Sequence, residues 1–119
     1  MGRLRSLSTS AALRQAADAY LATCFARPTP PRASELAATL EVSAHHLSRV
    51  FRTIVGVPLF RYLKDAQLAH AKQLLRTTAR PMNDIAYAAG FGTRTTFFRA
   101  FRRATGVTPT QYREIANIK

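Results

Sequence analysis

The 119-residue sequence is poor in cysteine and acidic residues and has no long hydrophobic run. Its single cysteine, Cys24, excludes an internal disulfide and a zinc site built from a cysteine cluster. No apolar run approaches the ~18–20 residues that a membrane span needs. The N-terminus also lacks the apolar stretch of a secretory signal. We therefore expect a cytoplasmic protein.

The sequence also lacks the residue groupings that typically carry catalysis. It has no Gly-rich phosphate loop, no Cys–His pair in a supporting context and no carboxylate pair in a polar motif. Its three histidines are not spaced as a ligand pair, so they do not indicate a metal site. We expect a protein that is not an enzyme and that needs no cofactor or metal.

The shortage of acids leaves the chain strongly basic, with 18 Lys and Arg against 6 Asp and Glu and a net charge of +12. Such an excess favours a polyanionic partner, nucleic acid first and an anionic membrane second. A basic surface selected for solubility is the alternative. However, no acidic residue lies between Glu41 and Asp65 or between Asp84 and Glu114. Because both stretches are rich in arginine, their composition favours nucleic-acid binding.

The spacing of apolar residues predicts an all-α fold of seven helices, because it follows a 3.6-residue period and shows no convincing strand alternation. The predicted helices cover about 11–27, 35–40, 44–55, 59–77, 85–90, 93–106 and 109–118. Ser34 and Ser43 have the chemistry of N-caps, and Gly56 and Gly106 that of helix stops. Thr108 and Gln111 form a capping-box pattern around a proline at the first helical position.

The same spacing predicts which side chains are buried. We expect Cys24 to be a core residue of the first helix rather than a reactive thiol. Ile115 is expected inward on the last helix, together with Tyr112 and Ala116. On the long helix the inward residues are expected to be Phe60, Leu63, Leu68, Ala71, Leu74 and Leu75.

The predicted helices form two similar units. Residues 49–52 (RVFR) match residues 99–102 (RAFR), and Gly56-Val57 matches Gly106-Val107 at the same spacing. Before the basic helices the offset drops by one residue, so the second turn is one residue longer. Such a match predicts two copies of one helix-turn-helix unit. We expect a loose segment at 1–10, a first subdomain at 11–58, a linker helix at 59–77 and a second subdomain at 78–119.

The motifs resemble the DNA-binding domain of the AraC/XylS family of bacterial transcription regulators over residues 11–116, almost the whole chain. The run 85–113 (IAYAAGFGTRTTFFRAFRRATGVTPTQYR) is the most specific part of the resemblance. In the first half, the resemblance is carried by Leu36-Ala37, Leu47-Ser48-Arg49-Val50-Phe51-Arg52, Gly56, Tyr62-Leu63, Ala71 and Leu74-Leu75.

The resemblance implies a sequence-specific, double-stranded-DNA-binding transcription regulator, more typically an activator, that works with RNA polymerase. It implies two recognition helices in successive major-groove segments, about one turn or ~34 Å apart, read by a monomer. By position, the base-reading residues are His45, Ser48, Arg49, Arg94, Thr95 and Arg99. Arginine can hold guanine O6 and N7 with two hydrogen bonds. The chemistry of Arg52, Arg102 and Arg103 suits phosphate contacts.

Two residues depart from the family's pattern, and a third, Arg99, has an alternative role. Phe98 stands where the family usually has a small polar residue, and we expect it to pack under a neighbouring arginine rather than touch a thymine methyl. Gln67 replaces a common family arginine, which removes one expected charged contact, either to DNA or within the protein. For Arg99, an intramolecular partner is the alternative to DNA.

Three other functions remain open at this point. A non-specific architectural DNA-binding protein would use the charge without reading bases. A DNA-repair protein with an AraC-like half would need a metal-bound cysteine, which the apolar setting of Cys24 disfavours. Larger family members carry a separate ligand-sensing domain that 119 residues do not accommodate, so the chain is either a stand-alone regulator or the DNA-binding domain of a larger ligand-responsive regulator.

Overall fold

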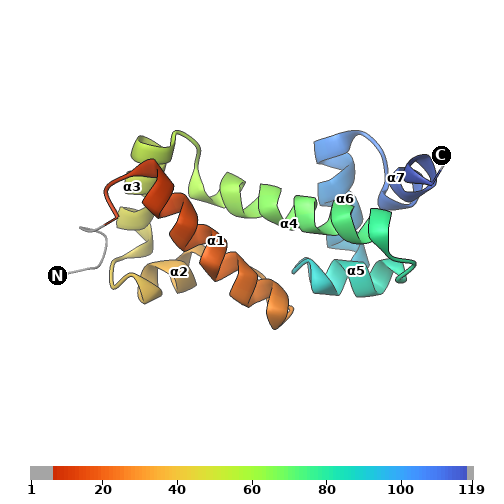
Figure 1. The fold of residues 1–119 in the computed structure, drawn as a ribbon, viewed down its shortest axis with the longest axis horizontal. Coiled ribbons are helices and arrows are strands. Elements are labelled where there is room, and N and C mark those ends of the chain that lie inside the picture. The colour runs from red at the N-terminus through yellow and green to blue at the C-terminus, as the bar shows by residue number, and fades with distance from the viewer. Residues whose placement is uncertain (1–6, 118–119) are drawn as a thin grey trace. The chain divides into compact units, whose positions relative to one another are not determined.

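The computed structural model describes residues 7–117, and this part of the chain contains seven α-helices and no strand, which confirms the predicted all-α class. Figure 1 shows them in chain order from red to blue. Their bounds are α1 Ser10–Ala26, α2 Ala33–Thr39, α3 Ala44–Val55, α4 Leu59–Thr77, α5 Met82–Ala88, α6 Arg94–Thr105 and α7 Pro109–Ala116. None of these helices is long and apolar enough to cross a membrane. Residues 1–6 of the predicted loose segment and the predicted helix end at Ile118 lie outside the described residues.

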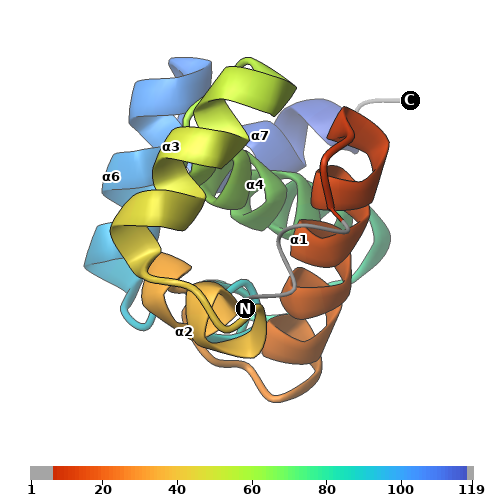
Figure 2. The same ribbon diagram turned by 90° about the vertical axis from the view of Figure 1, so that its left-hand side faces the viewer.

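The helices pack into two compact units. Among the described residues, the first unit contains 7–26 and 31–65, and the second contains 27–30 and 66–117, so that α4 contributes to both. In the first unit, α3 packs against α1 and α2. Figure 2 shows α2 lying between one end of α1 and one end of α3. In the second unit, α6 packs against α5 and α7.

The core of the first unit is built from apolar side chains of α1, α3 and the α2 region. Leu36, Ala37 and Leu40 of the α2 region are buried, as are Leu47 and Phe51 of α3. From α1, the buried residues are Leu13, Ala17, Leu21 and Cys24. Cys24 is fully buried, which confirms its prediction as a core residue.

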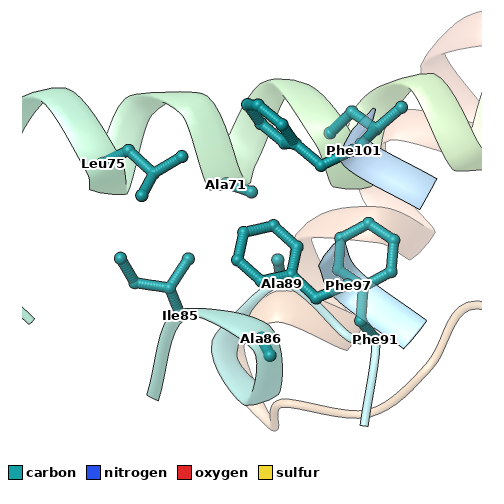
Figure 3. Close-up of a cluster of buried hydrophobic side chains, with 9 residues drawn as sticks. Ala71, Leu75, Ile85, Ala86, Ala89, Phe91, Phe97 and Phe101 are labelled. Carbon is teal, nitrogen blue, oxygen red and sulfur yellow. The ribbon is translucent and has the colours of Figure 1, made fainter. Parts of the chain in front are cut away.

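The core of the second unit is a cluster of aromatic and aliphatic side chains from α4, α5, α6 and the turn between α5 and α6. Figure 3 shows Leu75 and Ile85 pointing toward each other from α4 and α5, with the rings of Phe97 and Phe91 beside them. The Phe91 and Phe97 ring centroids lie 5.3 Å apart, and those of Phe97 and Phe101 lie 5.8 Å apart in an edge-to-face arrangement. Such ring pairs stabilise the core beyond what the burial of their apolar area alone provides.

The start of α2 differs from the prediction that Ser34 caps it. The helix begins at Ala33 with Arg32 as its N-cap residue, and no side chain of α2 caps it. Instead, the Tyr20 hydroxyl accepts a hydrogen bond from the Arg32 amide at 2.7 Å and donates to Glu35 Oε1 at 2.6 Å. Tyr20 thus bridges the two groups that a capping box joins directly. Burial, and then donation to Glu35, raise the pKa of the Tyr20 hydroxyl.

Two predictions of buried side chains are wrong. Phe60 is 70% exposed, because Leu59 and Leu63, one helical turn apart, occupy the inward face at this end of α4. Ile115 is 59% exposed, since Tyr112 and Ala116 occupy the inward side of the short α7 and Ile115 falls to its edge. The prediction for Leu63, Leu68, Ala71 and Leu75 is confirmed, whereas Leu74 is half-buried.

Arg113 holds the end of α4 and the following loop against α7. Its guanidinium donates to three backbone carbonyls, those of Leu75 at 3.3 Å, Arg80 at 2.9 Å and Thr78 at 3.1 Å. These carbonyls lie at and beyond the last turn of α4, where no intrahelical donor is available. Arg113, which contributes to the basic charge of the second acid-poor stretch, is therefore structural.

We expect Arg113→Met to lower the free energy of unfolding by about 1 kcal/mol, since charge-assisted hydrogen bonds are lost but water replaces part of them at this half-exposed site. Urea denaturation measures the loss. Arg103→Met removes the same charge from an exposed site that has no described intramolecular partner, and it should change stability by less than about 0.5 kcal/mol. Equal losses for the two variants would contradict the structural role of Arg113.

Candidate nucleic-acid interface

The first candidate recognition helix, α3, is fixed at both ends by local chemistry. The Ser43 side chain accepts a hydrogen bond from the His46 amide at 3.0 Å, which confirms Ser43 as the N-cap. Gly56 ends the helix with a φ of 95°, a left-handed conformation that a side chain disfavours. Leu47 and Phe51 are fully buried. The opposite side carries the predicted contact residues: His45, Arg49 and Arg52 are exposed and Ser48 is half-buried.

The second candidate recognition helix, α6, has the same construction. Thr93 accepts from the Thr96 amide at 3.1 Å, and its hydroxyl also donates to the Thr96 hydroxyl at 3.0 Å. Gly106 ends the helix at a φ of 84°. Phe97 and Phe101 are fully buried. The predicted contact residues Arg94, Thr95, Arg99, Arg102 and Arg103 are all exposed.

The turns that precede α3 and α6 share one backbone hydrogen bond. The Val42 amide donates to the Ala37 carbonyl at 3.0 Å, and the Phe91 amide donates to the Ala86 carbonyl at 2.9 Å. The left-handed residue before this amide is Glu41, at a φ of 61°, in the first turn and Gly90, at 82°, in the second. The second turn then has an additional residue before its cap, which confirms the predicted difference in length.

A Phe–Tyr ring pair supports each recognition helix from behind. The Phe51 and Tyr62 centroids lie 5.3 Å apart with the rings at 69°, and those of Phe101 and Tyr112 lie 5.4 Å apart at 74°. This near-identical geometry confirms the internal repeat.

The hydroxyl partners of the two tyrosines differ in charge. The Tyr62 hydroxyl donates to Asp18 Oδ1 at 2.8 Å, whereas the Tyr112 hydroxyl accepts from the Arg76 guanidinium at 2.8 Å. Burial, followed by the bond to Asp18, raises the pKa of the Tyr62 hydroxyl.

The exposed faces of α3 and α6 are positively charged, and most of their arginines have no intramolecular partner among the described residues. Neither helix contains an acidic residue. Within residues 7–117, no hydrogen bond or ion pair engages the side chains of Arg49, Arg52, Arg99, Arg102 and Arg103. The intramolecular alternative for Arg99 therefore has no partner in this part of the chain. Guanidinium groups in this state are available to phosphates and base edges.

Phe98 packs under an arginine, as predicted. The Arg94 Cζ lies 4.8 Å from the centroid of the Phe98 ring. Phe98 is half-buried, and its ring stands at 89° to that of Phe97 with the centroids 5.8 Å apart. Arg94 is thus exposed but held by an aromatic surface.

Gln67 has a role that the sequence reasoning missed. It is only 6% exposed, and its Nε2 donates to the Ala89 carbonyl at 3.1 Å. Ala89 lies directly after α5, so this hydrogen bond fixes α4 to the turn before α6. A signal for burial was present, since Gln67 lies one helical turn from both Leu63 and Ala71, which are buried.

The side chains that could ligate a metal do not gather in the described part of the chain, where no group of three or more His, Cys, Asp or Glu is placed for this. His45 is exposed at the start of α3 and Cys24 is enclosed in the core of the first unit.

A family model described as "Helix-turn-helix domain" matches residues 36–115, about two thirds of the chain, and spans both helix-turn-helix units. The chain belongs to the AraC/XylS family.

The chain is similar in sequence to two proteins that are named as regulators. The chain is 42% identical over 71 residues to regulatory protein SoxS of Salmonella typhimurium. The aligned residues cover 60% of this chain and 66% of SoxS. It is 36% identical over 84 residues to the transcriptional regulator Rob of the same species. The aligned residues cover 71% of this chain and 29% of Rob. The matched region thus spans less than two thirds of each relative.

The fold also matches that of a solved structure. The C-terminal domain of AraT, a response regulator from Geobacillus stearothermophilus, has a TM-score of 0.77 and 31% identity, covering 87% of this chain and 84% of that one.

Proposed function

We propose that the chain is a sequence-specific, double-stranded-DNA-binding transcription regulator that inserts α3 and α6 into successive major-groove segments. One observation carries this proposal: two helices with the same kind of N-cap, glycine stop and ring support each expose an acid-free face. Apart from Arg94, which lies over the Phe98 ring, the arginines of these faces have no described intramolecular partner. Recognition helices of this kind read base edges from their N-terminal and outward residues. The two subdomains proposed are 11–58 and 78–119, joined by the helix at 59–77.

The proposed contacts divide by chemistry. We assign the contacts with base edges to the outward residues in the first turns of each helix. We assign the contacts with phosphates to arginines nearer the helix ends. The base-reading set is His45, Ser48 and Arg49 in α3 and Arg94, Thr95 and Arg99 in α6. The phosphate set is Arg52, Arg102 and Arg103. All of these residues except the half-buried Ser48 are exposed.

The wider role proposed is transcription activation in the cytoplasm, in association with the nucleoid, with RNA polymerase as the protein partner. SoxS and Rob are named as regulators, and this supports a regulatory role for this chain. The proposal includes no catalysis and no cofactor. It holds for the 119 residues acting alone or as the DNA-binding domain of a larger ligand-responsive regulator.

In-vitro selection from random duplexes of about two helical turns tests the proposal. We expect selection to enrich an asymmetric site with two short boxes about one helical turn apart. We expect one monomer of the protein to bind both boxes. A non-specific architectural protein would instead show a steep salt dependence and little preference among sequences. Selection without any enriched motif would overturn the proposal in favour of that alternative.

A further inference from the structure

We propose that Phe98 is a specificity-determining positioning residue that holds the Arg94 guanidinium for base readout at the start of α6. The inference rests on the proposed function, because it concerns how one of the proposed base-reading residues is prepared for DNA. It is carried by the contact between the Arg94 guanidinium and the Phe98 ring, with 4.8 Å between Cζ and the ring centroid.

The Phe98 ring is itself held in place. It packs against the second unit's core, where the fully buried Phe97 ring meets it at 89°. Phe98 is half-buried, so part of it remains at the surface that α6 exposes. Because the Phe98 ring is anchored on the core, its position is set before DNA binds.

The ring limits the freedom of Arg94. Arg94 is the first residue of α6, directly after the Thr93 cap, and Phe98 lies one helical turn further along the same side. A guanidinium over a ring face is attracted by the ring's quadrupole, and its N–H groups still point outward in its own plane. These N–H groups are the ones that hold guanine O6 and N7. A side chain ordered before binding loses less conformational entropy when DNA binds.

The first unit provides an internal comparison. The first and fifth residues of α3 are Ala44 and Ser48, where α6 has Arg94 and Phe98. The arrangement of cation and ring therefore belongs to α6 alone among the two recognition helices. If it sets specificity, its loss should affect only the box that α6 reads.

The test compares two substitutions of Phe98 in the full chain. Phe98→Leu keeps an apolar side chain on Phe97 but removes the ring, and Phe98→Tyr keeps the ring. For Phe98→Leu we expect discrimination at one base position of the α6 box to fall about two- to fivefold, the range given by an exposed cation–π contact. Phe98→Tyr should retain it. The other box should be unaffected, and the salt slope unchanged because no charge is removed.

A double-mutant cycle assigns the effect to Arg94. In an Arg94→Ala background, Phe98→Leu should cause no further loss of discrimination. A further loss in that background, or an even loss of affinity for all sequences, would overturn the inference. So would full discrimination by Phe98→Leu, or no loss of discrimination from Arg94→Ala.

A measurement without DNA separates this inference from the proposed function. In the free chain, the Phe98 ring current should shift the NMR signals of the Arg94 side-chain protons upfield. The shift should disappear in Phe98→Leu and persist in Phe98→Tyr. An absent shift in the unmodified chain would overturn the inference and leave the proposed function standing. A normal shift without any selected motif would instead show that the proposed function has failed, and with it the role in readout.

Discussion

Phe101→Ala is expected to lower the free energy of unfolding by about 3–5 kcal/mol, the largest effect of any substitution considered. The Phe101 ring is fully buried and makes edge-to-face contacts with Phe97 and Tyr112. Truncation removes both contacts and leaves a cavity in the core of the second unit. Urea denaturation followed by circular dichroism measures the loss.

Phe60→Ala is the matched control, because it makes the same chemical change at a side chain that is 70% exposed. We expect it to change stability by less than about 0.5 kcal/mol. The difference between the two variants therefore reports burial and not phenylalanine content. Equal losses would contradict the packing described for α6.

The parts of the fold that could be predicted from the sequence are those fixed by neighbouring residues. Ser43 and Thr108 cap their helices through groups three positions away, and Gly56 and Gly106 end theirs through their own backbone conformation. The seven helices and the internal repeat follow from such local chemistry together with hydrophobic spacing.

The parts that could not be predicted depend on distant partners. Tyr20 holds the start of α2 from 12 to 15 positions away, so the local candidate, Ser34, was the wrong cap. The carbonyl partners of Arg113 lie 33 to 38 positions before it, and no local pattern distinguishes this arginine from those that face outward. Composition alone therefore overstates the charge available to DNA.

The candidate site falls between these two cases. The resemblance assigned Arg49 and Arg99 to base reading, and the structure places both side chains at the surface. The sequence predicted that Phe98 packs under a neighbouring arginine, and the structure shows that this arginine is Arg94. The roles of all these residues on DNA stay predictions, since base contacts depend on a partner that the sequence does not contain.

The second large effect concerns base readout by Arg49 and Arg99. Each arginine is exposed on its own recognition helix and has no intramolecular partner in the described chain. A bidentate contact with guanine is worth about 1–3 kcal/mol of discrimination, or roughly five- to 150-fold. We expect Arg49→Ala to lose this discrimination in the box read by α3 and Arg99→Ala to lose it in the box read by α6. Arg52→Ala serves as a control that removes one charge from a proposed phosphate contact.

The most direct measurement is a competition binding assay on the selected site, in which each box is altered in turn and tested against both variants. We expect a reciprocal result. Altering the α3 box should no longer weaken binding by Arg49→Ala but should still weaken binding by Arg99→Ala. Altering the α6 box should weaken binding by Arg49→Ala but no longer by Arg99→Ala. Arg52→Ala should weaken all sites evenly and reduce the salt slope by about one. If Arg49→Ala and Arg99→Ala instead weakened every sequence equally, the claim of two separate reading helices would be contradicted.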